Sequence, residues 1–199
     1  MGRKSNAPRR REQIVWGLYE CLAERGQEKV TVREIAAKAG LPSGVIHYYF
    51  KSKDDIISCL AVAIVEKYGK LIDEKIAAAP STELKIESAI DFIVDELVFN
   101  PPLNRVFYNL IQMAFERKNL EKVVRGLLKE YRQRLAHVFE EAGAGKASKG
   151  LGAALVAVTE GFSLQCLVDP KAFKRKEVRR LIAQAVAYRL SISVSDRAG

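Results

Sequence analysis

The sequence has few of the residues that build disulfide frameworks and metal sites. Its 199 residues include three cysteines, Cys21, Cys59 and Cys166, which are far apart and odd in number. Such a set argues against a disulfide framework and fits a reducing compartment, so we expect a cytoplasmic protein. The two histidines, His47 and His137, have no second histidine or cysteine near them in the sequence. We therefore expect no metal site and no cofactor.

A long, uninterrupted apolar run is also missing. The most apolar stretch, residues 151–168, contains four polar residues, so we expect it not to span a bilayer. The charged start, residues 1–11, is not followed by an apolar segment, and we expect no signal peptide. We find no Ser-His-acid set, no phosphate-binding glycine loop and no metal-ligand spacing, so we expect a protein that is not an enzyme.

Positive charge is concentrated in the first quarter of the chain. The formal net charge is +9, and residues 1–53 contain 11 Lys and Arg against 5 Asp and Glu, whereas residues 54–199 contain 22 against 19. Phosphate is a natural partner for this bias, because cationic side chains release the counterions that condense on nucleic acid. A membrane surface would also attract the charge, but no amphipathic helix with a strong aromatic anchor accompanies it. The charge distribution favours nucleic acid.

Residues 31–53 predict two short helices joined by a tight turn. Thr31 and Glu34 form a capping box that starts the first helix. Gly40 ends this helix, since glycine tolerates the left-handed backbone found at many helix C-termini. Ser43 can cap a second helix that runs to Tyr49. This spacing is that of a helix-turn-helix, whose second helix enters the major groove of DNA. The alternative is an ordinary pair of core helices.

The second helix has an unusual surface for a core element. Ile46 and Phe50 are four residues apart and can face inward together. The outward residues are small at the tip, where the helix can approach base edges, and aromatic behind it. Tyrosine hydroxyls can bond phosphate, and Lys53 adds a cation just after the helix. The outward set is Ser43, Gly44, Val45, His47, Tyr48 and Tyr49. An exposed tyrosine pair could instead form a protein interface, but the surrounding positive charge favours DNA.

Residues 11–56 resemble the DNA-binding domain of TetR-family (tetracycline-repressor-like) regulators. The resemblance is carried by the runs TVREIAAKAG, from Thr31 to Gly40, and HYYFKSK, from His47 to Lys53. The sequence departs from the family pattern at Pro42, where serine is common, and at His47, where tyrosine is common. The first departure affects the capping of the turn, and the second removes one tyrosine expected to contact phosphate.

The resemblance implies a role for each residue of the motif. Thr31 and either Tyr48 or Tyr49 would contact phosphate, and Arg33 would reach a base. The small residues at the start of the second helix would lie at the floor of the groove: Ser43, Gly44 and Val45. Outside the motif, the polar side of the first helix offers further candidates for backbone contacts, which are Arg9, Arg10 and Arg11.

The remainder of the chain predicts an all-α fold of about nine helices. Hydrophobic periodicity indicates helices over residues 9–25, 53–79, 81–99, 101–117, 120–142, 147–168 and 175–193 in addition to the short pair. Trp16 falls off the apolar face of the first of these, and we expect a partly exposed ring. We divide the chain into a helix-turn-helix domain, residues 1–53, and a helical effector-binding and dimerisation domain, residues 54–199.

The resemblance also implies an effector pocket and a dimer interface in the second domain. The last two helices would pair with those of a second copy; the alternative is a hairpin within one chain. The pocket would be apolar, with Glu96 or Glu160 as an isolated polar anchor, although residues of this kind are more often plain core. The candidates are Phe92, Glu96, Phe107, Ile111, Phe115 and Tyr131.

We therefore expect a homodimeric repressor that binds a palindromic site on double-stranded DNA. A small apolar or amphipathic effector would release it by favouring a conformation with the wrong spacing between reading helices. No membrane partner is expected. The alternative is an architectural or protein-binding DNA factor with no small-molecule effector, whose second domain would be fully packed.

Overall fold

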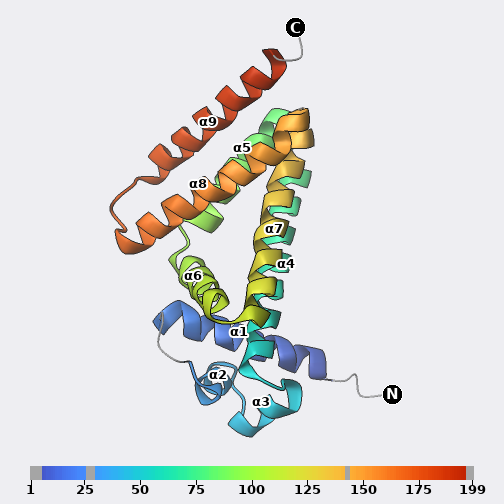
Figure 1. The fold of residues 1–199 in the computed structure, drawn as a ribbon, viewed down its shortest axis with the longest axis vertical. Helices are drawn as coiled ribbons and strands as arrows, with labels where there is room; N and C mark the ends of the chain where they lie inside the picture. The colour runs from blue at the N-terminus through green and yellow to red at the C-terminus, as the bar shows by residue number, and fades with distance from the viewer. Residues whose placement is uncertain (1–5, 26–29, 142–143, 196–199) are drawn as a thin grey trace. The chain divides into compact units, whose positions relative to one another are not determined.

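The computed structural model describes residues 6–25, 30–141 and 144–195. These residues form nine α-helices and no strand (Figure 1). In chain order the helices are α1 (Ala7–Arg25), α2 (Val32–Lys38), α3 (Ser43–Tyr49), α4 (Lys53–Ala77), α5 (Thr82–Phe92), α6 (Pro101–Glu116), α7 (Lys118–Glu141), α8 (Ser148–Val168) and α9 (Arg175–Ser195). A π-helix, η1 (Ile93–Val98), continues α5, and a short 3₁₀ helix, η2 (Gly145–Ala147), precedes α8. The predicted all-α fold is confirmed.

The chain forms two compact units, and three helices run from one unit into the other. The first unit comprises residues 1–64 and 105–127, and the second comprises residues 65–104 and 128–199. Helices α4, α6 and α7 each cross this boundary along their length. These two packing units therefore differ from the two functional domains predicted from the sequence, which are divided after residue 53. The functional division stays a prediction.

The first unit buries the apolar face of α1 against the helix-turn-helix and α4. Ile14 and Leu18 of α1 are almost fully buried, as are Ile35, Ile46 and Ile56 of the next three helices. A Cβ atom on Gly17 would lie 2.8 Å from the carbonyl oxygen of Ile35, so glycine at this position permits the close approach of α1 and α2. Trp16 is half-buried, as predicted, and its ring meets that of Tyr19 edge-on.

The second unit has its own core and a polar link between its helices. Phe92, Leu135, Phe139, Val178 and Ile182 belong to one buried cluster drawn from α5, α7 and α9. Two ion pairs of 2.5 Å tie α9 to the α5–η1 segment, and they join Arg175 to Asp95 and Arg179 to Asp91.

Local signals set most helix starts, and one prediction about them is wrong. Ser52 and Asp55 cap α4 reciprocally, at 3.1 Å in both directions, and the side chain of Ser81 caps α5. Ser43, however, does not cap α3 but is its first residue. Pro42 occupies the cap position with extended backbone, and no side chain caps this helix. The helix predicted over residues 81–99 is also interrupted, because its second half winds as the π-helix η1.

One described helical segment is long and apolar enough to cross a membrane by length and composition alone. It is residues 145–168, in which the most apolar window of 18 residues has a mean hydropathy of 1.6. The core helix of a soluble protein passes the same test, and Leu151, Leu155 and Val156 of this segment lie in the buried cluster of the second unit. This segment is therefore only weak evidence for a membrane-spanning helix.

Candidate nucleic-acid interface and effector region

The predicted capping box fixes the start of α2. The backbone nitrogen of Thr31 donates to Glu34 Oε2 at 2.8 Å, and the Thr31 hydroxyl accepts from the backbone nitrogen of Glu34 at 3.3 Å. The hydroxyl also lies 2.8 Å from Glu34 Oε2, to which it can donate. The Thr31 side chain is exposed, so it combines a local capping role with access to a phosphate.

The turn between α2 and α3 depends on Gly40. Its φ angle is +65°, in the left-handed region that glycine adopts at little cost. Around it, the Gly40 nitrogen donates to the Ala37 carbonyl and the Leu41 nitrogen to the Ala36 carbonyl, at 3.1 and 2.9 Å. These bonds satisfy carbonyls that the helix end would leave unpaired. The turn thus sets the angle at which α3 leaves α2.

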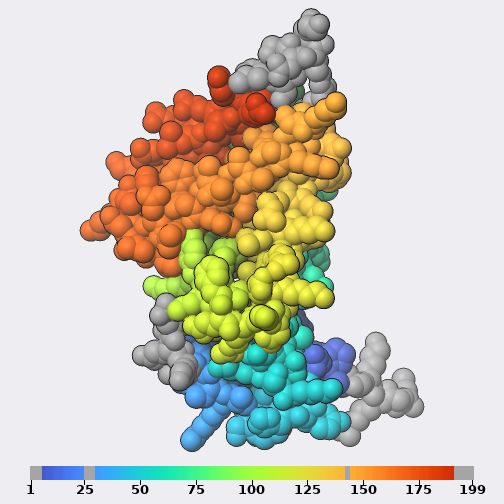
Figure 2. Space-filling model, in the orientation of Figure 1, coloured from blue at the N-terminus to red at the C-terminus, as the bar shows by residue number. Residues whose placement is uncertain are grey.

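Helix α3 exposes the residues that the sequence assigns to DNA. Ile46 and Phe50 face inward and are 1% and 4% exposed, as predicted. The outward residues lie at the surface of the first unit, where Figure 2 shows this segment in cyan. Ser43, Gly44, His47 and Tyr48 are exposed, with 83% for Tyr48, whereas Val45 and Tyr49 are half-buried. A Cβ atom on Gly44 would meet nothing within 4 Å, so the tip of the helix is open.

Arg11 fastens the end of α3 to the rest of the first unit. Its guanidinium donates to the carbonyl oxygen of Tyr49 and lies 4.1 Å from the centre of the Phe50 ring. One of its nitrogens also lies 3.5 Å from Cys59 Sγ on α4. The sequence marks this arginine only as a candidate for a backbone contact. Its partners are 38 and 48 residues away, so no local pattern reveals the contact.

The two cations of the motif have different surroundings. Arg33 is exposed at the start of α2. The Lys53 ammonium is half-buried and donates to the carbonyl oxygen of Val30 at 3.0 Å, which ties the start of α4 to the residue before the capping box. Lys53 therefore has a positioning role in the free protein beside any contact with phosphate.

A polar cluster joins the start of α4 to the junction of α6 and α7 within the first unit. Arg117 Nη1 is 2.5 Å from Asp54 Oδ1, and Asn119 Nδ2 is 3.0 Å from Asp54 Oδ2. The hydrogen bond from Asn119, together with that from Arg117, lowers the pKa of Asp54 below its ordinary value despite partial burial. Arg105 is the first residue of α6 that belongs to this unit, and it donates to the carbonyl oxygen of Ala23 at 3.3 Å.

The effector candidates are divided between the two units. In the second unit Phe92 is buried, Tyr131 packs against the same cluster and Glu96 is half-buried in η1. In the first unit Phe107 and Ile111 are half-buried, whereas Phe115 is 86% exposed and lies at the surface.

The Glu160 carboxyl lies close enough to the Tyr131 hydroxyl for its charge to act on it. Burial raises the pKa of the Tyr131 hydroxyl, which interacts with Thr159 and the charge of Glu160. Burial also raises the pKa of the Glu160 carboxyl, and the charge of Arg132 opposes this shift. A phenol and a carboxyl are thus held together in a water-poor part of the second unit. Within the described ranges, no group of three or more His, Cys, Asp or Glu side chains could hold a metal ion.

The geometry of α2, the turn and α3 defines the class of protein. A capped first helix, a glycine turn and a second helix with exposed small and tyrosine side chains form a helix-turn-helix, which presents its second helix to the major groove. The charge of the first quarter of the chain matches this use. The chain is a helix-turn-helix DNA-binding protein.

Comparison with known proteins identifies the family. Residues 17–58 match the bacterial regulatory proteins of the tetR family, and residues 83–191, more than half of the chain, match the C-terminal part of BetI-type transcriptional repressors. The chain therefore belongs to the TetR family, with a C-terminal part of the BetI type. The expected family and regulatory function are confirmed.

Individual relatives agree with this assignment. The transcriptional regulator PksA of Bacillus subtilis is 26% identical, with 98% of this chain and 96% of PksA covered. The regulator FadR of Bacillus subtilis, solved with stearoyl-CoA, has the same fold at a TM-score of 0.70 and 21% identity, covering 92% of this chain and 97% of FadR. A regulator from Saccharomonospora viridis, solved with choline, has a TM-score of 0.77 at 15% identity, covering 90% and 96%. These relatives are regulators, which points away from an enzyme.

Proposed function

We propose that the protein is a homodimeric repressor that binds a palindromic DNA site in the cytoplasm without catalysing a reaction. The proposal rests on the exposed surface of α3. This surface combines tyrosine side chains with a helix tip that is open at Gly44. The match of residues 83–191 to BetI-type repressors supports repression rather than activation. Thr31 and either Tyr48 or Tyr49 are assigned to phosphate, Arg33 to a base, and the tip of α3 to the floor of the groove.

The dimer is proposed to form through α8 and α9. Both helices expose apolar side chains away from the core of the second unit: Leu164 is 48% exposed, Val168 79%, Leu181 42% and Tyr188 70%. Apolar surface concentrated on two adjacent helices is a common mark of a protein interface. Gly161 lies on the exposed side of α8, and a Cβ atom there would meet nothing within its own chain. Its small size leaves room for a partner helix.

The effector is proposed to be an amphipathic molecule with its polar end at Tyr131 and Glu160. Burial raises the pKa of both groups, and a hydrogen bond from a ligand to either of them is stronger in such a water-poor site than in water. Phe92 and Glu96, which belong to the same unit, remain candidates for the rest of the site. Phe107, Ile111 and the exposed Phe115 belong to the first unit and stay predictions from the sequence.

Selection of bound sequences from random DNA duplexes tests the DNA-binding proposal. The wild type is expected to enrich a palindrome, and Arg33→Ala to lose preference at one position of each half-site, at about 1–3 kcal/mol for a bidentate base contact. Lys129→Ala is the control, because Lys129 is an exposed cation of the second unit that lies outside the helix-turn-helix and outside the proposed dimer helices. Enrichment of no palindrome, or an equal loss in both variants, contradicts the proposal.

Release of the selected DNA tests the effector proposal. Stearoyl-CoA and choline, the ligands of the two related structures, are suitable first probes, followed by amphipathic amines and acids. A cationic effector should lose potency in Glu160→Gln and keep it in Glu140→Gln, an exposed residue of α7. A protein that holds its DNA against all of these compounds favours the alternative of a DNA-binding factor without an effector.

A further inference from the structure

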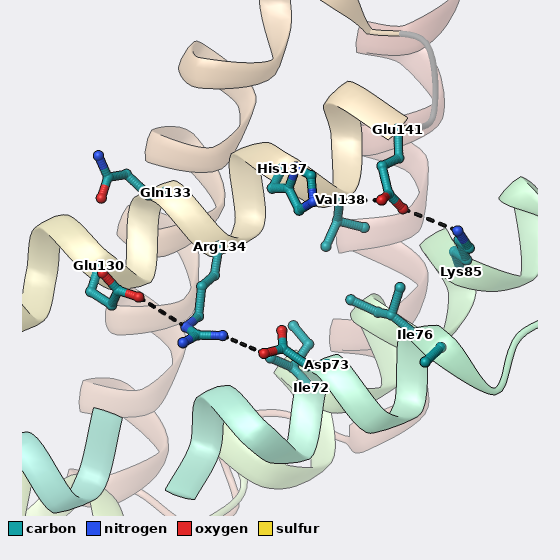
Figure 3. Close-up of a pocket in the computed structure, with 11 residues that line it drawn as sticks. Ile72, Asp73, Ile76, Lys85, Glu130, Gln133, Arg134, His137, Val138 and Glu141 are labelled. Atoms are coloured by element: carbon teal, nitrogen blue, oxygen red, sulfur yellow. Dashed lines mark hydrogen bonds and ion pairs between the residues drawn. The ribbon is translucent and has the colours of Figure 1, made fainter. Parts of the chain in front are cut away.

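A groove of about 610 Å³ lies between α4 and α7 in the second unit (Figure 3). Its floor is apolar, since Ile72 and Val138 are 3% and 4% exposed and Ile76 is half-buried. The described residues that line it include none of the candidate effector residues. Its volume is within the range of small-molecule sites, about 300–1,000 Å³, and an apolar floor with a few convergent polar groups is typical of them.

One end of the groove is closed by Arg134. Its Nη1 atom is 2.5 Å from Asp73 Oδ2 on α4, and its Nε atom is 3.2 Å from Glu130 Oε1 on α7. Gly69 allows this arrangement, because a Cβ atom there would lie 2.7 Å from Arg134 Cζ. The guanidinium therefore lies across α4 and holds two carboxylates at this end (Figure 3).

The other end is closed by Lys85 of α5. Its ammonium is 3.0 Å from Glu141 Oε2, and His137 Nε2 is 3.5 Å from Glu141 Oε1. The hydrogen bond and charge of Lys85 lower the pKa of Glu141, so this carboxyl stays ionised well below neutral pH. The apolar floor lies between these two polar ends, as Figure 3 shows.

The charges of the groove do not cancel. Three carboxylates face two permanent cations, so the groove carries one net negative charge while its imidazole is neutral. Each carboxylate offers about four lone-pair sites, and the contacts described above occupy only part of them. The groove can therefore accept further hydrogen bonds from a ligand, and a ligand with one positive charge would neutralise it.

We propose that this groove binds a primary or secondary ammonium ion that carries an aliphatic body. The ammonium donates to the carboxylates of Asp73, Glu130 or Glu141, and the aliphatic body covers Ile76 and Val138. A quaternary ammonium fits less well, because it has no N–H to donate and relies on aromatic faces. The described lining residues include no Phe, Tyr or Trp. The ligand class therefore differs from choline, which the related regulator holds.

Methyl NMR with three probes that share an eight-carbon chain tests the proposal. Octylammonium is expected to shift the methyl signals of Ile72, Ile76 and Val138, octyltrimethylammonium to bind several-fold more weakly, and octanoate not to bind in the groove. Glu141→Gln should weaken octylammonium binding by about tenfold, the effect of losing one charge-assisted hydrogen bond. Glu140→Gln, a neighbouring exposed residue outside the groove, should change it less than twofold.

Three results would overturn the proposal. They are unshifted groove methyls at saturating octylammonium, equal affinity for the quaternary probe, and equal weakening by the two glutamine variants. Glu160→Gln separates this site from the proposed effector region. If Glu160→Gln abolishes octylammonium binding and Glu141→Gln does not, the amine binds near Tyr131, which leaves the proposed function standing and the groove without a ligand.

Discussion

Arg11 joins three helices of the DNA-binding unit through one guanidinium group. It bonds the last carbonyl of α3, covers the Phe50 ring and approaches Cys59 on α4. Cation–π contacts and charged hydrogen bonds at exposed sites contribute about 0.5–1.5 kcal/mol each, and solvent reduces their sum. We therefore expect Arg11→Ala to lower the free energy of unfolding by about 1 kcal/mol, measured in urea.

The same substitution should weaken DNA binding although Arg11 need not contact DNA. A loosened α3 must be ordered again on binding, and about 1 kcal/mol corresponds to roughly a fivefold loss of affinity. In the unfolding measurement, Arg10→Ala is the matched control, since Arg10 bonds Gln13 on its own helix. Equal stability of Arg11→Ala and Arg10→Ala would show that the contacts of Arg11 do not position α3.

At the scale of elements, Asp54 links the helix that follows α3 to the junction of α6 and α7. Its pKa is lowered in the folded state by Asn119 and Arg117, so its contribution to stability is present above the unfolded pKa of about 4. That contribution is lost as the pH falls through the lower, folded value. Asp54→Asn should therefore lower the unfolding free energy by about 0.5–1 kcal/mol at pH 7, and the difference from wild type should shrink below about pH 4.

Urea unfolding at pH 7, 5 and 3.5 measures this dependence. Glu121→Gln serves as the control, because the ion pair of Glu121 with Arg125 lies along a single helix. A pH-independent difference between Asp54→Asn and wild type would mean that the substitution acts by another route than the ionised carboxylate.

Helix starts and ends were largely predictable, because the signals that set them are local. The Thr31–Glu34 and Ser52–Asp55 boxes and the glycine turn at Gly40 each depend on residues within a few positions. The π-helix η1 was not predictable in this way. It is an irregular winding held by residues outside it, such as Asn104, which donates to the Val98 carbonyl at 2.9 Å.

Sequence patterns also could not predict the contacts that position the candidate site. Arg11 with Tyr49, Lys53 with Val30 and Arg117 with Asp54 are 38, 23 and 63 residues apart. Periodicity places each residue on a helix face but does not show which face of another helix it meets. Exposure of the α3 residues, in contrast, followed from the pattern, because Ile46 and Phe50 fix the inward side.

At the scale of the whole molecule, the proposed dimer determines how tightly DNA is bound. Leu164 and Leu181 lie on the exposed apolar side of α8 and α9, and a glutamate at each would place unpaired charge in the proposed interface. The double variant Leu164→Glu, Leu181→Glu should sediment as a folded monomer, because both side chains are largely outside the core of their own chain. Leu84→Glu, at a similarly exposed leucine of α5, should remain a dimer.

The monomer should bind a palindromic site far more weakly than the dimer does. Once one head is bound, its tethered partner faces the second half-site at an effective concentration that can reach the millimolar range, so joined heads gain roughly 10²–10⁴ in affinity. The monomeric variant should lose about this factor on the full site and almost none on an isolated half-site. Fluorescence anisotropy at fixed salt compares the two DNAs, since the salt concentration alone shifts all such affinities. Equal loss on both DNAs would show that the glutamates damage the head itself, and undiminished binding to the full site would place the dimer interface elsewhere on the chain.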